Sequence, residues 1–243
     1  MKGFIWFLLG VAAGLAIALV VDRTKPIVIN ETSSVNIVER QYDVAEFTGV
    51  KVGGAFNAVL NHGEPGVTVQ VPEELLPYVK VECIDGILTV TTRGRVKVKA
   101  SHSRFKAFIT LPELHYIGVS GASNVLATDF TGSDVDVDAS GASDLDMGGD
   151  VTRININASG AASVSFKGLA EFVTIEASGA ADVFLMGEGA LLRVKASGAA
   201  DVDADEFGAD SVSVDASGAA GVDYHEAVNE SVKTRGSASV EKH

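Results

Sequence analysis

Four aspartates in the C-terminal half occupy matching positions of a short repeat. Asp182 and Asp201 share one position, and Asp203 and Asp223 share another. If the copies stack as strands, equivalent side chains lie about 4.8 Å apart, and like charges at that distance in water repel by about 1 kcal/mol or less. Carboxylate oxygens are the ligands that Ca²⁺ prefers. These aspartates are therefore a candidate calcium site, and the alternative is a solvated acidic face.

A basic segment offers the opposite chemistry. Six cations follow one another without an intervening acid, four of them at every second position: Arg93, Arg95, Lys97, Lys99, Arg104 and Lys106. Because strand side chains alternate between two faces, Val96 and Val98 should pack inward and leave the cations as one exposed stripe. This stripe is a candidate binding site for an anionic envelope polymer or for the protein's own acidic repeats. The alternative is an edge strand whose charges prevent fibre growth.

Charges also alternate in sign two residues before the Ser-Gly step of successive repeats. Glu176, Lys195 and Asp215 occupy this position. In a stack of strands they form a salt ladder, worth about 0.2 to 1 kcal/mol per exposed pair.

Catalytic patterns are absent from the sequence. The segment from Gly118 to Ala122 ends in alanine, where the nucleophile elbow of hydrolases requires glycine. The histidines His62, His102, His115 and His225 stand singly, without the spacing of metal ligands. A series of serines, Ser140, Ser159, Ser178, Ser197 and Ser217, could offer hydroxyls to a glycan, but serine at a tight corner is more typical of turns. We therefore predict no enzyme, no catalytic residue and no cofactor other than the candidate Ca²⁺.

The element that must position these residues is a repeat of 18 to 20 residues. Seven copies lie between Ile117 and Val240, and each contains a Ser-Gly step or, in the last copy, Arg235-Gly236. Within a copy, bulky apolar residues alternate with polar ones, which is the period-two pattern of a strand. A second set of glycines follows half a repeat later and predicts another turn, so that each coil has two short strands around a glycine corner: Gly132, Gly148, Gly168, Gly187 and Gly208.

Repeats of this length are stable only when they stack. Propeller blades need about 40 to 50 residues, and leucine-rich repeats need a leucine and asparagine pattern that this chain lacks. We expect an all-β protein, a single-stranded, right-handed parallel β-helix with coils of about 19 residues. Residues 117–243 form its regular repeats. Residues 45–116 form a first coil, where the repeat phase recurs from Val50 to Leu60, and a cap of antiparallel strands.

The N-terminus indicates a location. Gly3 to Val21 is a run of 19 uncharged, mostly apolar residues, just long enough to span a bilayer. Residues 1–22 are thus expected to be a transmembrane signal anchor, or a signal peptide cleaved after Ala18, and residues 23–44 a tether. The membrane is the partner expected for residues 3–21.

The charge of the chain is uneven. The net charge is -13; residues 1–116 carry 12 basic and 11 acidic side chains, whereas residues 117–243 carry 7 and 21. An acidic solenoid repels phosphate backbones and argues against a nucleic-acid partner. With one cysteine, Cys83, the chain forms no internal disulfide.

The order of motifs resembles a known family. Val52-Gly53-Gly54-Ala55-Phe56, the strand pair around Asp85-Gly86, the Ile109 to Leu114 segment and then the Ser-Gly-Ala series are similar to the auto-transporter adhesin head GIN domain family, over about residues 45–240. The resemblance implies a bacterial, extracytoplasmic parallel β-helix without known catalytic residues. One departure is that Ser-Gly-Ala stands where the family often has asparagine at its corners.

These observations lead to one functional expectation with two alternatives. We expect a non-enzymatic module of the cell envelope, structural or adhesive, that binds a glycan, another envelope polymer or a surface protein, as a monomer or a homo-oligomer, in the periplasm or at the surface, membrane-anchored or secreted. The alternatives are the ectodomain of an envelope-stress sensor and a polysaccharide lyase or hydrolase, which would need a cleft with an acid and a base.

Overall fold

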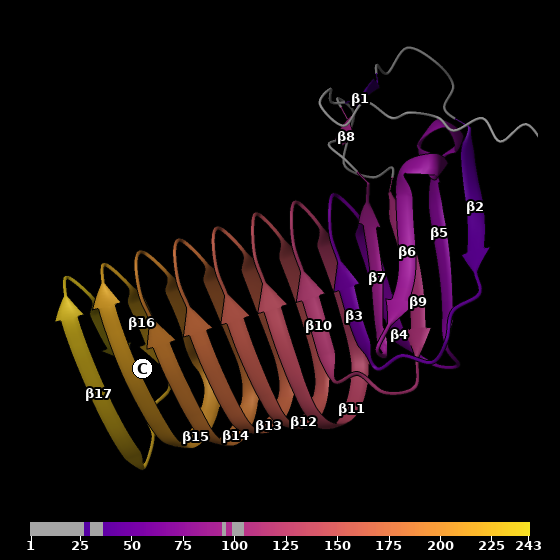
Figure 1. The fold of residues 1–243 in the computed structure, drawn as a ribbon. Coiled ribbons are helices and arrows are strands. Elements are labelled where there is room, and N and C mark those ends of the chain that lie inside the picture. The colour runs from indigo at the N-terminus through magenta and orange to yellow at the C-terminus, as the bar shows by residue number, and fades with distance from the viewer. Residues whose placement is uncertain (1–26, 30–35, 94–95, 99–104) are drawn as a thin grey trace, which may run out of the picture.

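The computed structural model describes residues 27–29, 36–93, 96–98 and 105–243. Five long strands form the body of the molecule, and each pairs in parallel with the next. They are β11 (Asn124–Ala139), β12 (Asp144–Ala158), β13 (Ser163–Ala177), β14 (Asp182–Ala196) and β15 (Asp201–Gly218). Their arrows stand side by side along the axis of a solenoid of about seven turns (Figure 1). The expectation of an all-β parallel solenoid is thus confirmed.

Shorter strands complete the stack at both ends. β10 (Tyr116–Val119) pairs with β11 on one side and with β3 (Gly49–Val52) on the other. β4 (Asn57–His62) pairs in parallel with the first part of β11. The repeat phase seen between Val50 and Leu60 therefore corresponds to a coil that lies directly on the regular ones. At the far end lie β16 (Gly221–Tyr224), β17 (Asn229–Gly236) and β18 (Ser239–Lys242).

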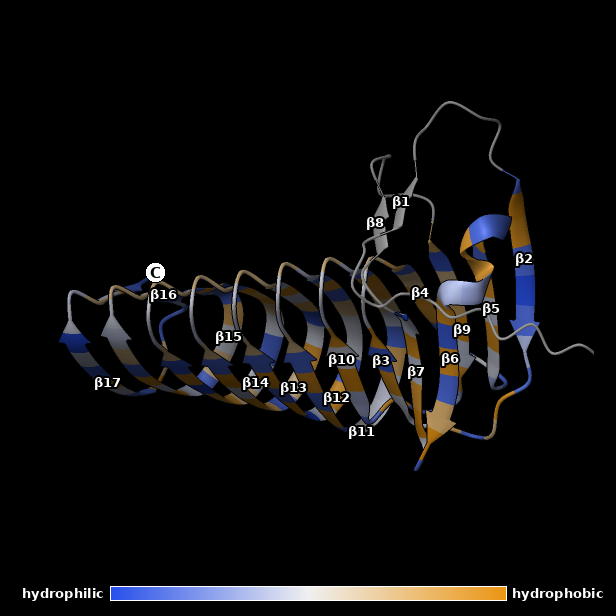
Figure 2. Ribbon diagram, turned by 45° about the horizontal axis from the view of Figure 1, so that its top comes forward, coloured by the Kyte–Doolittle hydropathy of each residue, from blue (hydrophilic) through white to orange (hydrophobic). Residues whose placement is uncertain are grey.

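The core is a column of alternate residues. Ile154, Ile156, Val173 and Ile175 are each at most 1% exposed, whereas the residues between them are not fully buried. The same alternation continues from coil to coil and appears as orange bands along the strands (Figure 2). Because each coil contributes only a few apolar residues, burial depends on its neighbours, as the repeat length predicts.

The corner glycines are required for the stacking. Gly160 has φ of +77°, and a Cβ placed on it would lie 2.8 Å from the carbonyl oxygen of Gly141 in the preceding coil. Glycine adopts this left-handed conformation without a steric penalty. The Ala161 amide also donates to the Gly141 carbonyl at 2.8 Å, so the backbone ladder continues through the corner.

The second bend differs from the expectation of two short strands per coil. Pairing of β13 with β12 and with β14 continues through this bend, whereas the pairs β11–β12 and β14–β15 shift register near it. Each regular coil is nevertheless one long, bent strand. Gly149, Gly168 and Gly187 stack there in register, with φ between +136° and +154°. Gly148 is aligned with Lys167 instead. These glycines bend the strand while keeping its hydrogen bonds, which the sequence pattern alone did not distinguish from a turn.

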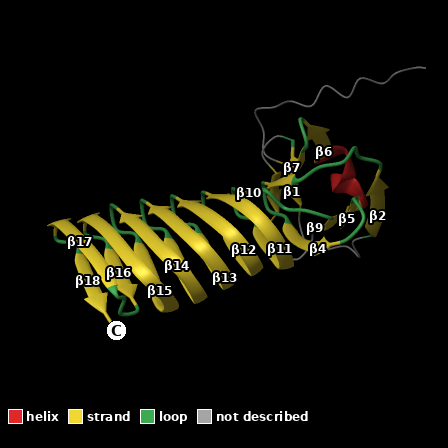
Figure 3. Cartoon of the chain, turned by 90° about the horizontal axis from the view of Figure 1, so that it is seen from below, coloured by secondary structure: helices red, strands yellow, loops and turns green. Residues whose placement is uncertain are grey.

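The N-terminal cap mixes two kinds of pairing. β7 (Ile87–Thr92) lies parallel to β3, and β9 (Lys106–Leu111) lies parallel to β4, so both extend the solenoid. The outer strands β2 (Ile37–Tyr42), β5 (Gly66–Pro72) and β6 (Val79–Ile84) are antiparallel to their neighbours. With the short helix η1 (Glu73–Tyr78) they close the end of the molecule (Figure 3). The expected antiparallel cap is therefore correct only for these outer strands.

The expected membrane segment, Gly3 to Val21, lies outside the described residues. In the part of the chain that the structure describes, no helix is long and apolar enough to cross a bilayer. β1 (Ile27–Ile29) and β8 (Val96–Val98) form a separate two-stranded parallel sheet. Ile37–Tyr42, within the range expected as a tether, forms β2 on the cap.

Charged residues occupy core register positions at the C-terminal end of the solenoid. The register aligns Glu230 with Val212 and Lys242 with Tyr224, so both charges stand at positions that are apolar in earlier coils. Lys242 Nζ lies 3.2 Å from Glu226 Oε1 and 3.5 Å from Glu230 Oε2. Inward charges of this kind discourage further strand addition at an open edge.

Candidate functional site

A polar trough runs along one side of the solenoid. It encloses about 840 Å³ and crosses six coils. We call its column of acidic, amide and basic side chains the wall, and its serines together with the buried alanines the floor. The wall residues are Asp138, Asn157, Glu176, Lys195, Asp215 and, at the register position of the serines, Arg235; the floor serines are Ser140, Ser159, Ser178, Ser197 and Ser217. We call this surface the trough.

The repeat itself places these side chains. The first five wall residues stand two positions before the Ser-Gly step, and parallel pairing aligns them in one column. Each serine is the last residue before the corner glycine, so the serines form a second column. Neighbouring members of a column are therefore about 4.8 Å apart. The chain presents the same two kinds of hydrogen-bonding group once in every coil.

The wall residues form three bonded groups. Asp138 accepts hydrogen bonds from Tyr116 Oη at 2.9 Å and from Asn157 Nδ2 at 3.1 Å. Lys195 Nζ donates to Glu176 Oε1 at 3.0 Å. Further along, one terminal nitrogen of Arg235 lies 2.6 Å and 2.7 Å from the two oxygens of Asp215.

The ionisation of the trough follows from these contacts. The hydrogen bond from Arg235 lowers the pKa of Asp215, and the same bond raises the pKa of Arg235. Partial burial, followed by its hydrogen bond to Asp138, raises the pKa of Tyr116 to about 12. At neutral pH the phenol is therefore a hydrogen-bond donor, and Asp215 is a carboxylate held by a cation.

The trough continues onto the cap. A smaller hollow of about 270 Å³ shares Asp138 and Ser140 with it and is also lined by Lys51, Thr91 and Ser120. Lys51 Nζ lies 5.2 Å from the centre of the Tyr116 ring, a favourable position for a cation. Polar groups are thus continuous from the cap to the last coil.

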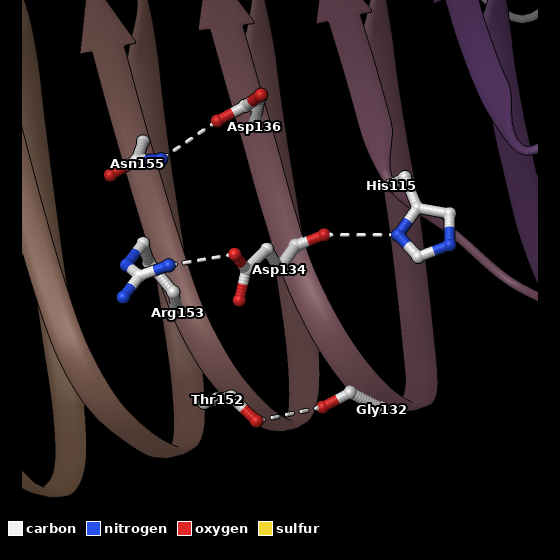
Figure 4. Close-up of polar contacts among 7 residues, drawn as sticks. All are labelled: His115, Gly132, Asp134, Asp136, Thr152, Arg153 and Asn155. Atoms are coloured by element: carbon white, nitrogen blue, oxygen red, sulfur yellow. Dashed lines mark hydrogen bonds and ion pairs between the residues drawn. The ribbon is translucent and has the colours of Figure 1, made fainter.

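A second row of contacts supports the wall beside the trough. Arg153 donates to Asp134 at 2.7 Å, and Asn155 donates to Asp136 at 2.8 Å. Both donors reach from β12 back to β11, and the His115 ring lies 3.2 Å from the Asp134 carbonyl oxygen (Figure 4). Asp136 and Asp138 lie on one face of β11 because strand side chains alternate. The acids of this coil are held in place by donors of the next.

The four aspartates of the candidate calcium site form two pairs. Asp182 is aligned with Asp201, and Asp203 with Asp223. A closer group, which the sequence analysis missed, consists of Asp223, Glu241 and His243, whose ligand atoms lie within 4.8 Å of one another. Glu241 is aligned with Asp223 in the degenerate last copy. Extending the repeat register to that copy would have predicted that the two acids lie side by side. Calcium at the aspartate pairs stays a prediction.

The basic stripe falls mostly outside the described residues. Arg95, Lys99 and Arg104 lie beyond them, and for Lys97 only the backbone, in β8, is described. Arg93 and Lys106 are exposed, the latter at the start of β9. The stripe stays a prediction.

The comparisons with known proteins agree on family and fold. No curated protein matches the chain. A putative adhesin from Bacteroides fragilis superposes with a TM-score of 0.77 at 18% identity, covering 86% of this chain and 98% of that one. A putative adhesin from Parabacteroides merdae gives 0.76 at 18% identity over 85% and 96%. A putative lipid binding protein from Parabacteroides distasonis gives 0.72 at 12% identity over 90% and 100%.

At these identities the likeness establishes the fold. The family model described as putative auto-transporter adhesin, head GIN domain, matches residues 46–242. This range covers almost all of the described chain and confirms the resemblance inferred from the Ser-Gly-Ala series. The protein therefore belongs to the auto-transporter adhesin head GIN domain family.

Proposed function

We propose that this chain is a non-catalytic, adhesin-like module of the bacterial envelope that binds an extended polymer, a glycan, along the trough. The observation that carries the proposal is the continuity of the trough, which presents hydrogen-bonding side chains across six successive coils. Membership of an adhesin family and structural similarity to putative adhesins support the same class of function.

An extended polymer fits the repeat better than a compact ligand. Groups that recur about every 4.8 Å along a straight line match a ligand whose own groups recur along a line. Each contact is weak, since one hydrogen bond contributes about 0.5 to 1.5 kcal/mol net. Several equivalent contacts on one chain add up, which is how a shallow surface gains affinity.

The lowered pKa of Asp215 suits a binding group of the trough better than a general acid. A glycosidase needs a carboxyl group whose pKa is raised so that it acts as an acid. The carboxyl shifts resolved in the described part of the chain, those of Asp215 and Glu230, both lower the pKa. Their hydrogen-bond donors, Arg235 for Asp215 and the Ala227 amide for Glu230, favour the ionised form.

The location of the module is proposed from its N-terminal segment. Gly3 to Val21, as a retained anchor or a cleaved signal peptide, would carry the solenoid out of the cytoplasm. The candidate Ca²⁺ at Asp182, Asp201, Asp203 and Asp223 and the binding of an anionic polymer by the basic stripe are secondary proposals.

The test is binding of the full-length protein to immobilised envelope polysaccharides. The trough variant Glu176→Ala with Lys195→Ala keeps the net charge and should lose most of the binding. The control variant Lys167→Ala with Glu171→Ala makes the same change at exposed positions of β13 outside the trough and should bind normally. Equal binding by both variants, or no binding to any polymer, would contradict the proposal.

A further inference from the structure

The wall of the trough has a period of two coils. At one register position, hydrogen-bond acceptors and donors alternate strictly from coil to coil. The column consists of Asp138, Asn157, Glu176, Lys195, Asp215 and Lys233, of which Lys233 continues the register in the last coil without lining the trough. Acids occupy every second coil, and a nitrogen donor stands between them. The chemical repeat of the wall is therefore about 10 Å, twice the strand spacing.

Bonding divides the wall into the same units. Asn157 reaches back to Asp138, Lys195 to Glu176, and the last coil reaches back to Asp215 through Arg235. Each of these bonds joins a donor to the acid of the preceding coil. The trough is thus built of three two-coil units, and in the third the bonded donor, Arg235, stands at the register position of the serines.

Each unit keeps hydrogen-bonding capacity for a ligand. A lysine ammonium has three donors, and Lys195 uses one of them on Glu176. An arginine has five donors, and one terminal nitrogen of Arg235 is engaged by Asp215. The carboxylates likewise have lone pairs to spare. A serine hydroxyl lies beside each of the first five members of the column.

The charges of the trough balance once its extension onto the cap is included, although the solenoid is acidic. Residues 117–243 have 7 basic and 21 acidic side chains. In the trough and its extension, the carboxylates of Asp138, Glu176 and Asp215 are matched by the cations Lys51, Lys195 and Arg235. A polyanion would meet three acids in the trough and the acidic field around it, and a polycation would meet three cations.

We infer that the trough recognises a glycan of zero net charge with a disaccharide repeat, which lies along the solenoid axis with one disaccharide on each two-coil unit. The inference rests on the proposed function and specifies its ligand. An extended disaccharide has about the length of two strand spacings, so its equivalent hydroxyls meet the same donor and acceptor in every unit. Three units predict that six sugars fill the trough.

The experiment measures the affinity of the full-length protein for oligosaccharides of two, four, six and eight sugars. The uncharged series are β-linked glucose, galactose, mannose and N-acetylglucosamine, and hyaluronate of the same lengths is the anionic series. For at least one uncharged series we expect affinity to rise about tenfold per added disaccharide, the effect of one or two hydrogen bonds, and to level off at six sugars. Hyaluronate should bind at least about tenfold more weakly at low salt.

A charge variant tests the same inference from the protein side. Glu176→Lys places three nitrogen donors in succession and gives the trough a positive charge, so it should weaken the uncharged series and strengthen hyaluronate. Glu171→Lys makes the same change at an exposed position outside the trough and should do neither. Circular dichroism confirms that both variants fold.

The outcomes separate the inference from the proposed function. Stronger binding of hyaluronate by the natural protein, a gain in affinity with no plateau, or no uncharged oligosaccharide bound would overturn the inference. The proposed function fails separately, when Glu176→Ala with Lys195→Ala leaves polymer binding unchanged.

Discussion

A buried serine in one of the first repeats lowers the stability of the folded protein. The inward position two residues after the corner glycine is Ala162, Ala181 and Ala200 in the regular coils but Ser123 and Ser143 in the first two. Ser143 Oγ donates to the Ser140 carbonyl oxygen at 3.0 Å. Ser123 Oγ is buried and has no hydrogen-bond partner among the described residues. An unsatisfied buried hydroxyl destabilises the folded state.

We therefore predict that Ser123→Ala stabilises the protein. The change removes the unpaired hydroxyl and introduces the residue that later coils use, so the free energy of unfolding should rise by about 1 kcal/mol or more. Urea denaturation measures the change. The matched variant Ser143→Ala loses a hydrogen bond and should be neutral or destabilising; a gain equal to that of Ser123→Ala would contradict the argument.

Replacement of a corner glycine should instead destabilise the protein. Gly179 has φ of +78°, and a Cβ there would lie 2.8 Å from the Gly160 carbonyl oxygen. Gly86 has a similar φ of +75°, but a Cβ on it would meet open space. Gly86→Ala should cost about 1 to 2 kcal/mol of stability, for the conformation alone. Gly179→Ala should cost about 1 to 3 kcal/mol more, for the steric contact. Equal losses in urea denaturation would show that stacking does not require glycine.

At the scale of elements, the sequence predicted the coils better than their ends. The period-two alternation and the Ser-Gly steps define β11 to β15 because every coil repeats the same local requirement. The cap was harder, since β7 and β9 join the stack through contacts between distant segments. The trough was only partly foreseen: the alternation of Glu176, Lys195 and Asp215 was visible as charge. Asp138 and Asn157 belong to the same column as an acceptor and a donor, and a search for opposite charges misses an asparagine.

The C-terminal coil should be the first element to lose structure in acid. Its Ala227 amide and Lys242 lower the pKa of Glu230, and Arg235 lowers that of Asp215. A carboxyl group with a lowered folded pKa stabilises the fold above its unfolded pKa, and the stabilisation is lost as pH falls through the folded value. Hydrogen exchange between pH 6 and about pH 3 should therefore show early loss of protection in β17 and β18, with β12 and β13 unchanged. In the double variant Glu230→Gln with Asp215→Asn, this pH dependence should disappear. A uniform loss of protection along the solenoid of the natural protein would contradict the prediction.

The whole molecule is a one-dimensional stack, so complete coils can be removed from it. Removal of one coil breaks the alternation of donors and acceptors along the wall, whereas removal of two keeps it. Each regular coil contacts mainly its two neighbours, and removal of a complete coil leaves compatible surfaces to pair. Deletion of residues 160–178 joins Ser159 to Gly179 and removes one coil. Deletion of residues 160–197 joins Ser159 to Gly198 and removes two.

The two deletions should fold alike and bind differently. The one-coil deletion removes Glu176 and sets Asn157 beside Lys195, which breaks the alternation of donors and acceptors. The two-coil deletion sets Asn157 beside Asp215, so the alternation is kept with one unit fewer. Circular dichroism should show β structure in both. Titration with the oligosaccharide series should show little binding to the first and a plateau at four sugars for the second. Binding by the one-coil deletion that equals or exceeds binding by the two-coil deletion would contradict the need for alternation, because the one-coil deletion keeps the longer trough.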